Sequence, residues 1–267
     1  AKVLALLEFV RDLPRTDANI AACLVDTVGQ PAPLVAVEAA LERLDKAQFV
    51  RNTEEGWKLQ TAQEKNWEAE RRSYLNPKPR DRNEIIRGGL SAIFEDPKLK
   101  TYRHQNLRIF RVGVTVNGSI VDEGQIPLNV IVAEDDESFT ERLQEIRNES
   151  RQPAHENEIY WVFSLNKTLD DQVAQLFASK EMVRKYDQLR AQNKITNEEL
   201  VCLQDEQSQL GRRQGFLRDR LTTAVENGQG LFRGNAKDAA ALGKALPDIF
   251  RSLFAYAVPD LYPKLEM

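Results

Sequence analysis

The sequence predicts an α+β, helix-rich protein. It predicts a winged helix-turn-helix domain, then a small α/β sheet unit with a long antiparallel helical hairpin. Three observations support this. Apolar residues recur at helical spacing near the start of the chain and again over residues 167–227. They alternate with other residues over 107–133, as in strands. The run Ile159–Phe163 is almost wholly apolar, which is typical of a buried central strand.

Composition limits the classes of function. The chain has 267 residues, 42% hydrophobic and 29% charged, which suits two or three small units. The net charge of −4 gives no general attraction to polyanions. The two cysteines, Cys23 and Cys202, are far apart without metal-binding spacing, so we expect a reducing, cytoplasmic location. We expect no membrane partner, because no apolar run could span a bilayer and no signal peptide is seen. The chain begins with Ala1, which suggests a piece of a larger protein.

Residues 1–62 have the order of a winged helix-turn-helix. Ala1–Thr16 carries an amphipathic stripe, and Asp17 is placed to cap a second short helix. A third helix buries residues between Val37 and Leu44. Two strands follow, Phe49–Thr53 and Gly56–Gln60, around a turn. Three helices and a terminal hairpin make up this fold.

A winged helix can bind DNA through its third helix or can contact proteins. Here the segment Leu34–Arg43 offers few donors to bases or phosphates and carries Glu38 and Glu42. The wing tip, Glu54 and Glu55, is acidic and would repel phosphate. The sequence therefore favours protein contacts for this domain.

Residues 63–106 form a charged helical linker with a basic patch. A helix over Glu64–Tyr74 with Trp67 as an apolar anchor is followed by a break at Asn76–Pro79 and by a helix over Glu84–Phe94. Basic residues outnumber acidic ones, so the segment is a candidate nucleic-acid surface. The alternative is a solvated linker whose arginines pair with neighbouring acids. The candidate residues are Arg71, Arg72, Lys78, Arg80, Arg82, Arg87, Lys98, Lys100 and Arg103.

Residues 107–166, with 228–267, form the small α/β unit. Phe110–Val116 alternates, Asn117-Gly118 favours a type I′ hairpin turn, and Ile126–Val132 is the expected return strand. Asp122–Gly124 makes a bulge or is itself the turn. Glu158–Leu165 is the expected central strand.

The acidic run Glu134–Glu137 precedes a helix expected over Ser138–Arg151. Acids at a helix N-terminus favour the helix dipole, which is a sufficient structural reason for them. The alternative, a divalent-metal cluster, needs further ligands that the sequence does not offer. We therefore expect no metal site.

Residues 167–227 are expected to form the helical hairpin. Thr168 with Asp171 and Thr196 with Glu199 have capping-box spacing. The second helix carries a heptad seam interrupted by Gln207 and Gln214, which would fix register. The residues expected to pack this arm are Leu200, Leu203, Leu210, Leu217 and Leu221.

The last segment has a short glycine-edged strand, Gly228–Gly234, and a helix expected over Lys237–Ala257 that Pro259 ends. Gly243-Lys244 is not a phosphate-binding loop, because the required first glycine is Asp238 and no Ser or Thr follows the lysine. The two histidines each stand alone in a polar loop. We therefore expect no catalytic residue and no cofactor in this chain, which is interpreted as a non-catalytic multidomain module.

The chain resembles the large P-loop ATPase of bacterial BREX phage-defence systems (the BrxC and PglY group). The resemblance covers most of the chain and contains no catalytic signature. It is carried by the order of the elements and by four stretches, Val37–Leu44, Phe49–Leu59, Gly228–Gly234 and Leu261–Lys264.

The resemblance implies a piece of a very large ATPase beside its ATP-binding domain. ATP and Mg²⁺ are then expected only in the parent protein, since no Walker motif occurs here. It also implies an accessory role in antiviral defence, with other defence subunits, a second copy or DNA as partners. The alternative is a purely structural scaffold that never touches nucleic acid.

Overall fold

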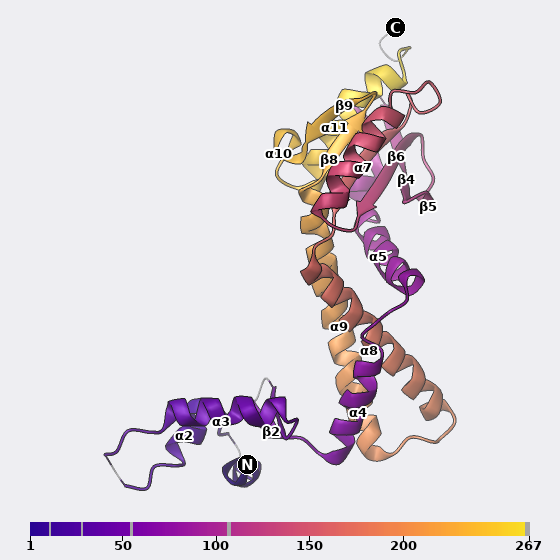
Figure 1. Cartoon of the computed structure of the whole chain (residues 1–267). Helices are drawn as coiled ribbons and strands as arrows, with labels where there is room; N and C mark the ends of the chain where they lie inside the picture. The colour runs from indigo at the N-terminus through magenta and orange to yellow at the C-terminus, as the bar shows by residue number, and fades with distance from the viewer. Residues whose placement is uncertain (11, 28, 54–55, 106–107, 265–267) are drawn as a thin grey trace. The chain divides into compact units, whose positions relative to one another are not determined.

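The computed structural model describes residues 1–10, 12–27, 29–53, 56–105 and 108–264. The protein is α+β and helix-rich, with 57% of its residues in helices. It has two compact units (Figure 1). Unit 1 is Ala1–Ser73 with Gln188–Leu203, and unit 2 is Tyr74–Asp187 with Gln204–Met267. The segment 63–106, expected as a separate linker, is thus divided between the units after Ser73.

Unit 1 contains a small core and a two-stranded antiparallel sheet. Its elements are α1 (Lys2–Leu7), α2 (Asp17–Ala22), α3 (Leu34–Lys46), β1 (Val50–Thr53), β2 (Gly56–Leu59) and α4 (Ala62–Ser73). The expected acidic turn, Glu54-Glu55, lies outside the described residues. The buried residues of the core are Leu4, Leu7, Ile20, Ala21, Val37, Leu41 and Val50.

The first helix is shorter than the sequence predicts. It ends at Leu7 rather than at Thr16, and Asp12 adopts a left-handed φ of 64° that a helix cannot contain. The backbone then runs to β2, where Arg15 O accepts a hydrogen bond from Trp57 N at 2.9 Å. The cap of α2 also differs: Thr16 Oγ1, not Asp17, accepts from a backbone N–H of the first turn.

Unit 2 is built on a mixed seven-stranded sheet with the order β3-β4-β6-β7-β8-β9, and β5 pairs with β4 off this path. Helices α5 (Pro79–Phe94) and α6 (Pro97–Lys100) precede it. The strand β7 is central, as predicted, and its first five residues are fully buried. The strands are β3 (Thr101–His104), β4 (Arg108–Val116), β5 (Ser119–Asp122), β6 (Ile126–Ala133), β7 (Ile159–Ser164), β8 (Gln229–Phe232) and β9 (Asn235–Asp238).

The predicted return strand of the first hairpin is wrong. The turn at Asn117-Gly118 leads into the short β5, which is antiparallel to β4, whereas β6 is parallel to β4. The connection from β5 to β6 crosses β4 at Gly113. A Cβ added to Gly124 would lie 2.2 Å from Gly113 N, so the two backbones touch only because both residues are glycine.

The two faces of the sheet are packed differently. One face carries the main core, with side chains from β4, β6 and β7 against helices that include α5, α9 (Asn197–Glu226) and α11 (Leu246–Leu261). The other face holds a small cluster under α7 (Asp136–Glu149), formed by Ile146, Tyr160, Val162 and Leu231. Alternation along β7 places Trp161 and Phe163 in the main core, and Tyr160 and Val162 under α7.

The C-terminal segment departs from the single predicted helix. Arg233 and Gly234 both have positive φ, 49° and 77°, and turn the chain from β8 into β9. The helix expected from Lys237 is instead two helices, α10 (Ala239–Leu242) and α11, separated at Gly243. Pro259 lies inside α11 and does not end it.

The helices α8 (Lys167–Ala191) and α9 account for residues 167–226. The predicted capping box is present at α9, where Thr196 N donates to Glu199 Oε2 and Glu199 N donates to Thr196 Oγ1. At α8 the cap is Asn166, whose Oδ1 accepts from Leu169 N, rather than Thr168. Of the leucines expected to pack this segment, Leu203, Leu217 and Leu221 are buried, whereas Leu200 and Leu210 are half-buried.

Candidate functional site

The basic residues predicted to bind nucleic acid are divided between the two units. Arg71 and Arg72 belong to α4 in unit 1, where Arg71 is buried at 5% exposure and Arg72 pairs with Glu68. The others belong to unit 2 and lie on α5 or close to it in sequence. Because α5 has 16 residues, its ends lie about 24 Å apart. In unit 2, Lys78, Arg80 and Arg82 lie at the start of α5, Arg87 lies midway along it, and Lys98, Lys100 and Arg103 follow its end.

Ion pairs remove part of this charge. Arg82 donates twice to Asp170 Oδ1, at 2.9 and 2.5 Å, which fixes its guanidinium at the start of α8. Lys100 Nζ lies 3.8 Å from Asp122 Oδ2. Within the described part of the chain, the candidate cations of unit 2 with no ion-pair partner are Lys78, Arg80, Arg87, Lys98 and Arg103, and all of them are exposed.

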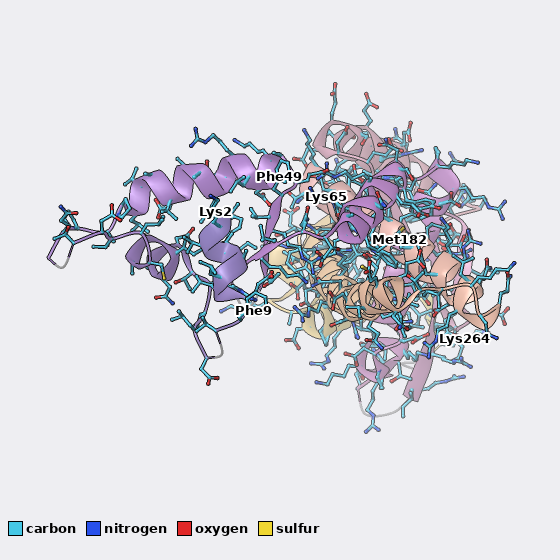
Figure 2. The ribbon with its side chains drawn as sticks, turned by 90° about the horizontal axis from the view of Figure 1, so that it is seen from below. Lys2, Phe9, Phe49, Lys65, Met182 and Lys264 are labelled. Atoms are coloured by element: carbon cyan, nitrogen blue, oxygen red, sulfur yellow. The ribbon has the colours of Figure 1, made fainter. Side chains whose placement is uncertain are left out.

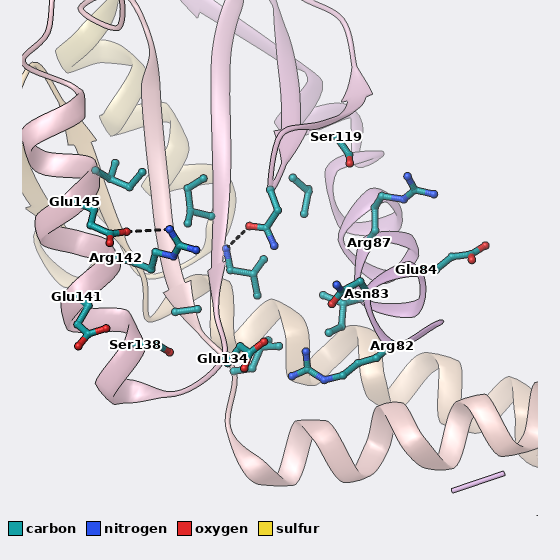
Figure 3. Close-up of a pocket in the computed structure, with 18 of the residues that line it drawn as sticks. Arg82, Asn83, Glu84, Arg87, Ser119, Glu134, Ser138, Glu141, Arg142 and Glu145 are labelled. Carbon is teal, nitrogen blue, oxygen red and sulfur yellow. Dashed lines mark hydrogen bonds and ion pairs between the residues drawn. The ribbon is translucent and has the colours of Figure 1, made fainter. Parts of the chain in front are cut away.

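A groove of about 1130 Å³ lies in unit 2 between α5 and α7, at the carboxyl ends of β4 and β6. Ligands of open parallel sheets commonly bind at this end of the strands. We call it the α5–α7 groove. Its floor includes Val116, Ile131 and Ala133, and its two walls are shown in Figure 3.

The walls of the α5–α7 groove carry opposite charge. The α5 side contributes Arg80, Arg82 and Arg87 with one acid, Glu84. The α7 side contributes acids with one arginine, Arg142, which is itself paired with Glu145 at 2.9 Å. A polyanion inside the groove would meet those carboxylates, so only the outer rim of α5 suits a phosphate backbone. The acids on the α7 side are Glu134, Glu141, Glu145 and Glu149.

The acidic run before α7 has a structural role in the fold. Asp135 is the N-cap of α7 and forms a capping box with Ser138: its Oδ1 accepts from Ser138 N at 2.8 Å. Hydrogen bonds from the backbone N–H and side chain of Ser138 hold the pKa of Asp135 below its usual value. Across the described residues, no cluster of three or more His, Cys, Asp or Glu side chains could hold a metal ion.

A polar ladder, which sequence reasoning missed, crosses the sheet on the α7 face. Thr115, Asn129 and Tyr160 are register partners on β4, β6 and β7. Thr115 Oγ1 donates to Asn129 Oδ1 at 2.5 Å, and Asn129 Nδ2 donates to Glu158 Oε2 at 3.1 Å. Tyr160 O–H donates to the same oxygen at 2.5 Å, and His155 Nδ1 lies 3.1 Å from it.

The polar ladder changes the pKa of Tyr160. Burial, the hydrogen bond to Glu158 and the charges of Glu158 and Glu149 all raise the pKa of Tyr160 well above its usual value. A neutral tyrosine held in this way donates a hydrogen bond and is a poor nucleophile. His155, expected to be isolated, therefore stands between two carboxylates, because its Nε2 also lies 3.6 Å from Glu149 Oε1. No spacing in the sequence reveals this, since the members come from three strands and a loop.

A second depression, of about 260 Å³, lies beside β3 and α11. Its apolar lining includes Tyr102, Phe250 and Phe254, and its basic residues are Lys98, Arg103 and Arg251. Burial raises the pKa of Tyr102 above its usual value. We call this depression the β3 edge groove.

Unit 1 exposes unusually many large apolar side chains for its small core. Phe9 is 88% exposed, Val35 79%, Leu6 70% and Phe49 52%. Figure 2 shows Phe49 beside Lys65, whose Nζ lies 4.0 Å from the ring centroid. Several large apolar side chains exposed on a small domain are candidates for contact with another protein. Leu13, Leu24 and Leu34 add to this exposure.

The α8–α9 pair contains a buried charged group. Glu206, 6% exposed, accepts a hydrogen bond from Arg213 Nη1 at 3.0 Å, and the same nitrogen donates to Ser179 on α8. Further along, Gln207 donates to Asp187 Oδ1 at 3.2 Å. Gln214, the other polar position of the predicted seam, is exposed. The sequence pattern identified Gln207 but missed the buried glutamate beside it.

The chain matches no protein-family model, no curated protein and no solved structure. Within the described ranges, no helix has both the length and the apolar character to cross a membrane.

Proposed function

We propose that this chain is a non-catalytic assembly region of a bacterial phage-defence ATPase of the BREX type, whose first unit holds a partner protein. The observation that carries the proposal is the exposure of Phe9, Val35 and Leu6 on a unit with a small core. Burying such side chains against a partner releases roughly 25 cal/mol per Å² of apolar area. The assignment to phage defence comes from the sequence resemblance.

In this proposal unit 1 is a winged helix used for protein contacts. The order α1, α2, α3, β1, β2 supports it, as does the hydrogen bond from Trp57 N to Arg15 O, which joins the segment before α2 to the hairpin. The exposed side of α3 carries Val35, Glu38 and Glu42, which suits a protein better than a phosphate backbone.

The helices α8 and α9 form the antiparallel hairpin of this proposal. Their contacts support it, because Ser179 meets Arg213 whereas the later residue Asp187 meets the earlier Gln207. Arg213, which pairs with the buried Glu206 on its own helix, also donates to Ser179 on α8, and this cross-helix bond would fix the register of the two helices, as a single buried polar group does in coiled coils. Such a hairpin is a spacer or arm.

The assembly proposal is tested with the variant Phe9→Ser/Val35→Ser. We expect it to lose co-purification with the other subunits of a BREX system and to lose any concentration-dependent increase in sedimentation coefficient. The matched control is Ile120→Ser, because Ile120 is 68% exposed but lies in unit 2. Equal co-purification of the wild type and the double variant, or a wild type that neither self-associates nor co-purifies, would overturn the proposal.

A second function is weak, sequence-independent contact with DNA. It is supported by Lys78, Arg80 and Arg87, which are exposed without an ion-pair partner among the described residues. Arg80 and Arg87 line the α5 side of the α5–α7 groove. Three phosphate contacts predict a slope of log affinity against log salt of about −3 on duplex DNA.

The DNA contact is tested by binding measurements across a salt series. The variant Arg80→Glu/Arg87→Glu should weaken binding and reduce the slope by about 2. The control Arg72→Glu, on α4 of unit 1 and paired with Glu68, should leave the slope unchanged. No wild-type binding even at low salt would leave the purely structural scaffold as the function of the chain.

A further inference from the structure

The strand β3 is an open edge of the seven-stranded sheet. One side of it pairs with β4, from Thr101 opposite Arg111 to His104 opposite Arg108. No strand of the described part of the chain pairs with the other side. Alternate residues of an antiparallel edge strand direct their N–H and C=O groups outward, where a further strand can bind them.

The β3 edge groove lies along this open edge. Its floor and walls are the apolar residues Tyr102, Phe250 and Phe254, next to Ile109, which is 55% exposed on β4 opposite Arg103. A strand added to β3 would therefore place every second side chain against an apolar recess. The recess is small, about 260 Å³, which is suited to single side chains.

The charge of this groove has one sign. Its lining includes Lys98, Arg103 and Arg251 and no carboxylate, in contrast to the acidic wall of the α5–α7 groove. Lys98 and Arg103 are exposed and have no ion-pair partner in the described ranges. Arg251 pairs with Asp248, whose oxygen lies 3.1 Å away. A ligand with carboxylates on alternate positions would complement these cations.

We propose that β3 binds an extended acidic segment of a partner protein as an added strand. Its backbone pairs with β3, its apolar side chains enter the recess, and its carboxylates face Lys98, Arg103 and Arg251. A nucleic-acid strand fits less well, because it has no backbone amides to pair with the open edge of β3. This site is separate from the apolar surface of unit 1 and from the cations at the start of α5.

The probe is a fluorescently labelled ten-residue peptide in which valine and glutamate alternate, titrated against the full chain. The control peptides are the valine–lysine analogue and a valine–glutamate peptide with alternate backbone nitrogens methylated. We expect binding of the first peptide only. We also expect hydrogen exchange to slow at β3 amides and not at β9, which is the other edge of the sheet.

Charge-reversal variants provide a second test of this proposal. The variant Lys98→Glu/Arg103→Glu should bind the acidic peptide with at least about tenfold lower affinity. It should also gain affinity for the valine–lysine analogue. Reversal of Arg80 and Arg87 should leave peptide binding unchanged, which separates this site from the proposed DNA contact. The proposal is overturned by equal binding of the acidic and basic peptides, by unimpaired binding of the methylated peptide, by the absence of binding, or by displacement with a ten-nucleotide single strand that binds more tightly.

Discussion

The two faces of the seven-stranded sheet differ in what they pack and in their role in the fold. The face that packs against α5, α9 and α11 carries the main apolar core, where Trp161 and Phe163 of β7 meet Phe250 of α11. The face under α7 carries only a small apolar cluster, and beside it lie the polar ladder and the Gly113–Gly124 crossing. The first face buries most of the apolar side chains, so it supplies most of the stability of unit 2. The second face imposes the unusual connection between β5 and β6 and holds its polar groups in one arrangement.

The largest effect is expected on the apolar face. Phe250 is 1% exposed and packs against the rings of Phe94 and Trp161, with centroids 5.6 and 5.0 Å away. The variant Phe250→Ala should lower the free energy of unfolding of unit 2 by about 3–5 kcal/mol. Hydrogen exchange of the β7 amides during denaturant titration measures this unit alone. Tyr256→Ala, on the exposed side of α11 at 37%, is the control and should cost about 1 kcal/mol or less.

The next effect tests the crossing on the α7 face. In Gly124→Ala the new Cβ would lie 2.2 Å from Gly113 N and 2.6 Å from Arg111 O, so backbone would have to move. We expect a loss of about 3 kcal/mol in unfolding free energy, from overpacking. Gly88→Ala is the control, because a Cβ there meets nothing within 4 Å. It should stabilise α5 by about 0.5–1 kcal/mol. An unchanged unfolding free energy in Gly124→Ala would show that the crossing is not tightly packed.

A smaller effect is expected from the polar ladder. Asn129→Leu removes the acceptor of Thr115 and one donor to Glu158. Because these groups lie partly buried, the loss should be about 1–3 kcal/mol. Adding Thr115→Val removes the hydroxyl that was left without an acceptor, so the double variant should cost less than the sum of the single variants. Strict additivity in denaturant unfolding would mean that the two side chains do not act together.

Local signals predicted the central elements of both faces well. The apolar run of β7, the alternation of β4 and β6, and the capping box of Thr196 with Glu199 depend on residues next to one another in sequence. Near neighbours decide such features, so the helices and strands appear close to where they were expected. The α+β, helix-rich class follows from them.

The errors arise where packing between distant segments decides. Nothing local distinguishes a return strand from a parallel one, so the direction of β6 depends on Gly113 and Gly124 meeting in space. The stripe of residues 1–16 predicted a long helix, yet Val10 is 49% and Leu13 37% exposed, so neither belongs to the buried core. The nucleic-acid role of the nine cations stays a prediction: they are close in sequence, but α5 lies between the groups of unit 2, and acidic side chains pair with Arg82 and Lys100.

The smallest expected effect is the pH dependence of the unfolding free energy that is due to one buried tyrosine on each face. The pKa of Tyr102 is raised by burial, whereas that of Tyr160 is raised by burial together with the hydrogen bond to Glu158 and the charges of Glu158 and Glu149. Folding favours the neutral phenol in both cases. The resulting stability is therefore fully present below the unfolded pKa of about 10 and is lost as pH rises above it. At pH 7, Tyr160→Phe should cost about 1 kcal/mol through the lost hydrogen bond. Between pH 9 and 11 the difference in unfolding free energy between wild type and variant should shrink, and more for Tyr160→Phe than for Tyr102→Phe. Equal pH dependence in the two variants would mean that the carboxylates on the α7 face do not raise the pKa of Tyr160 beyond the effect of burial. The pKa of a buried tyrosine would then be raised equally on both faces.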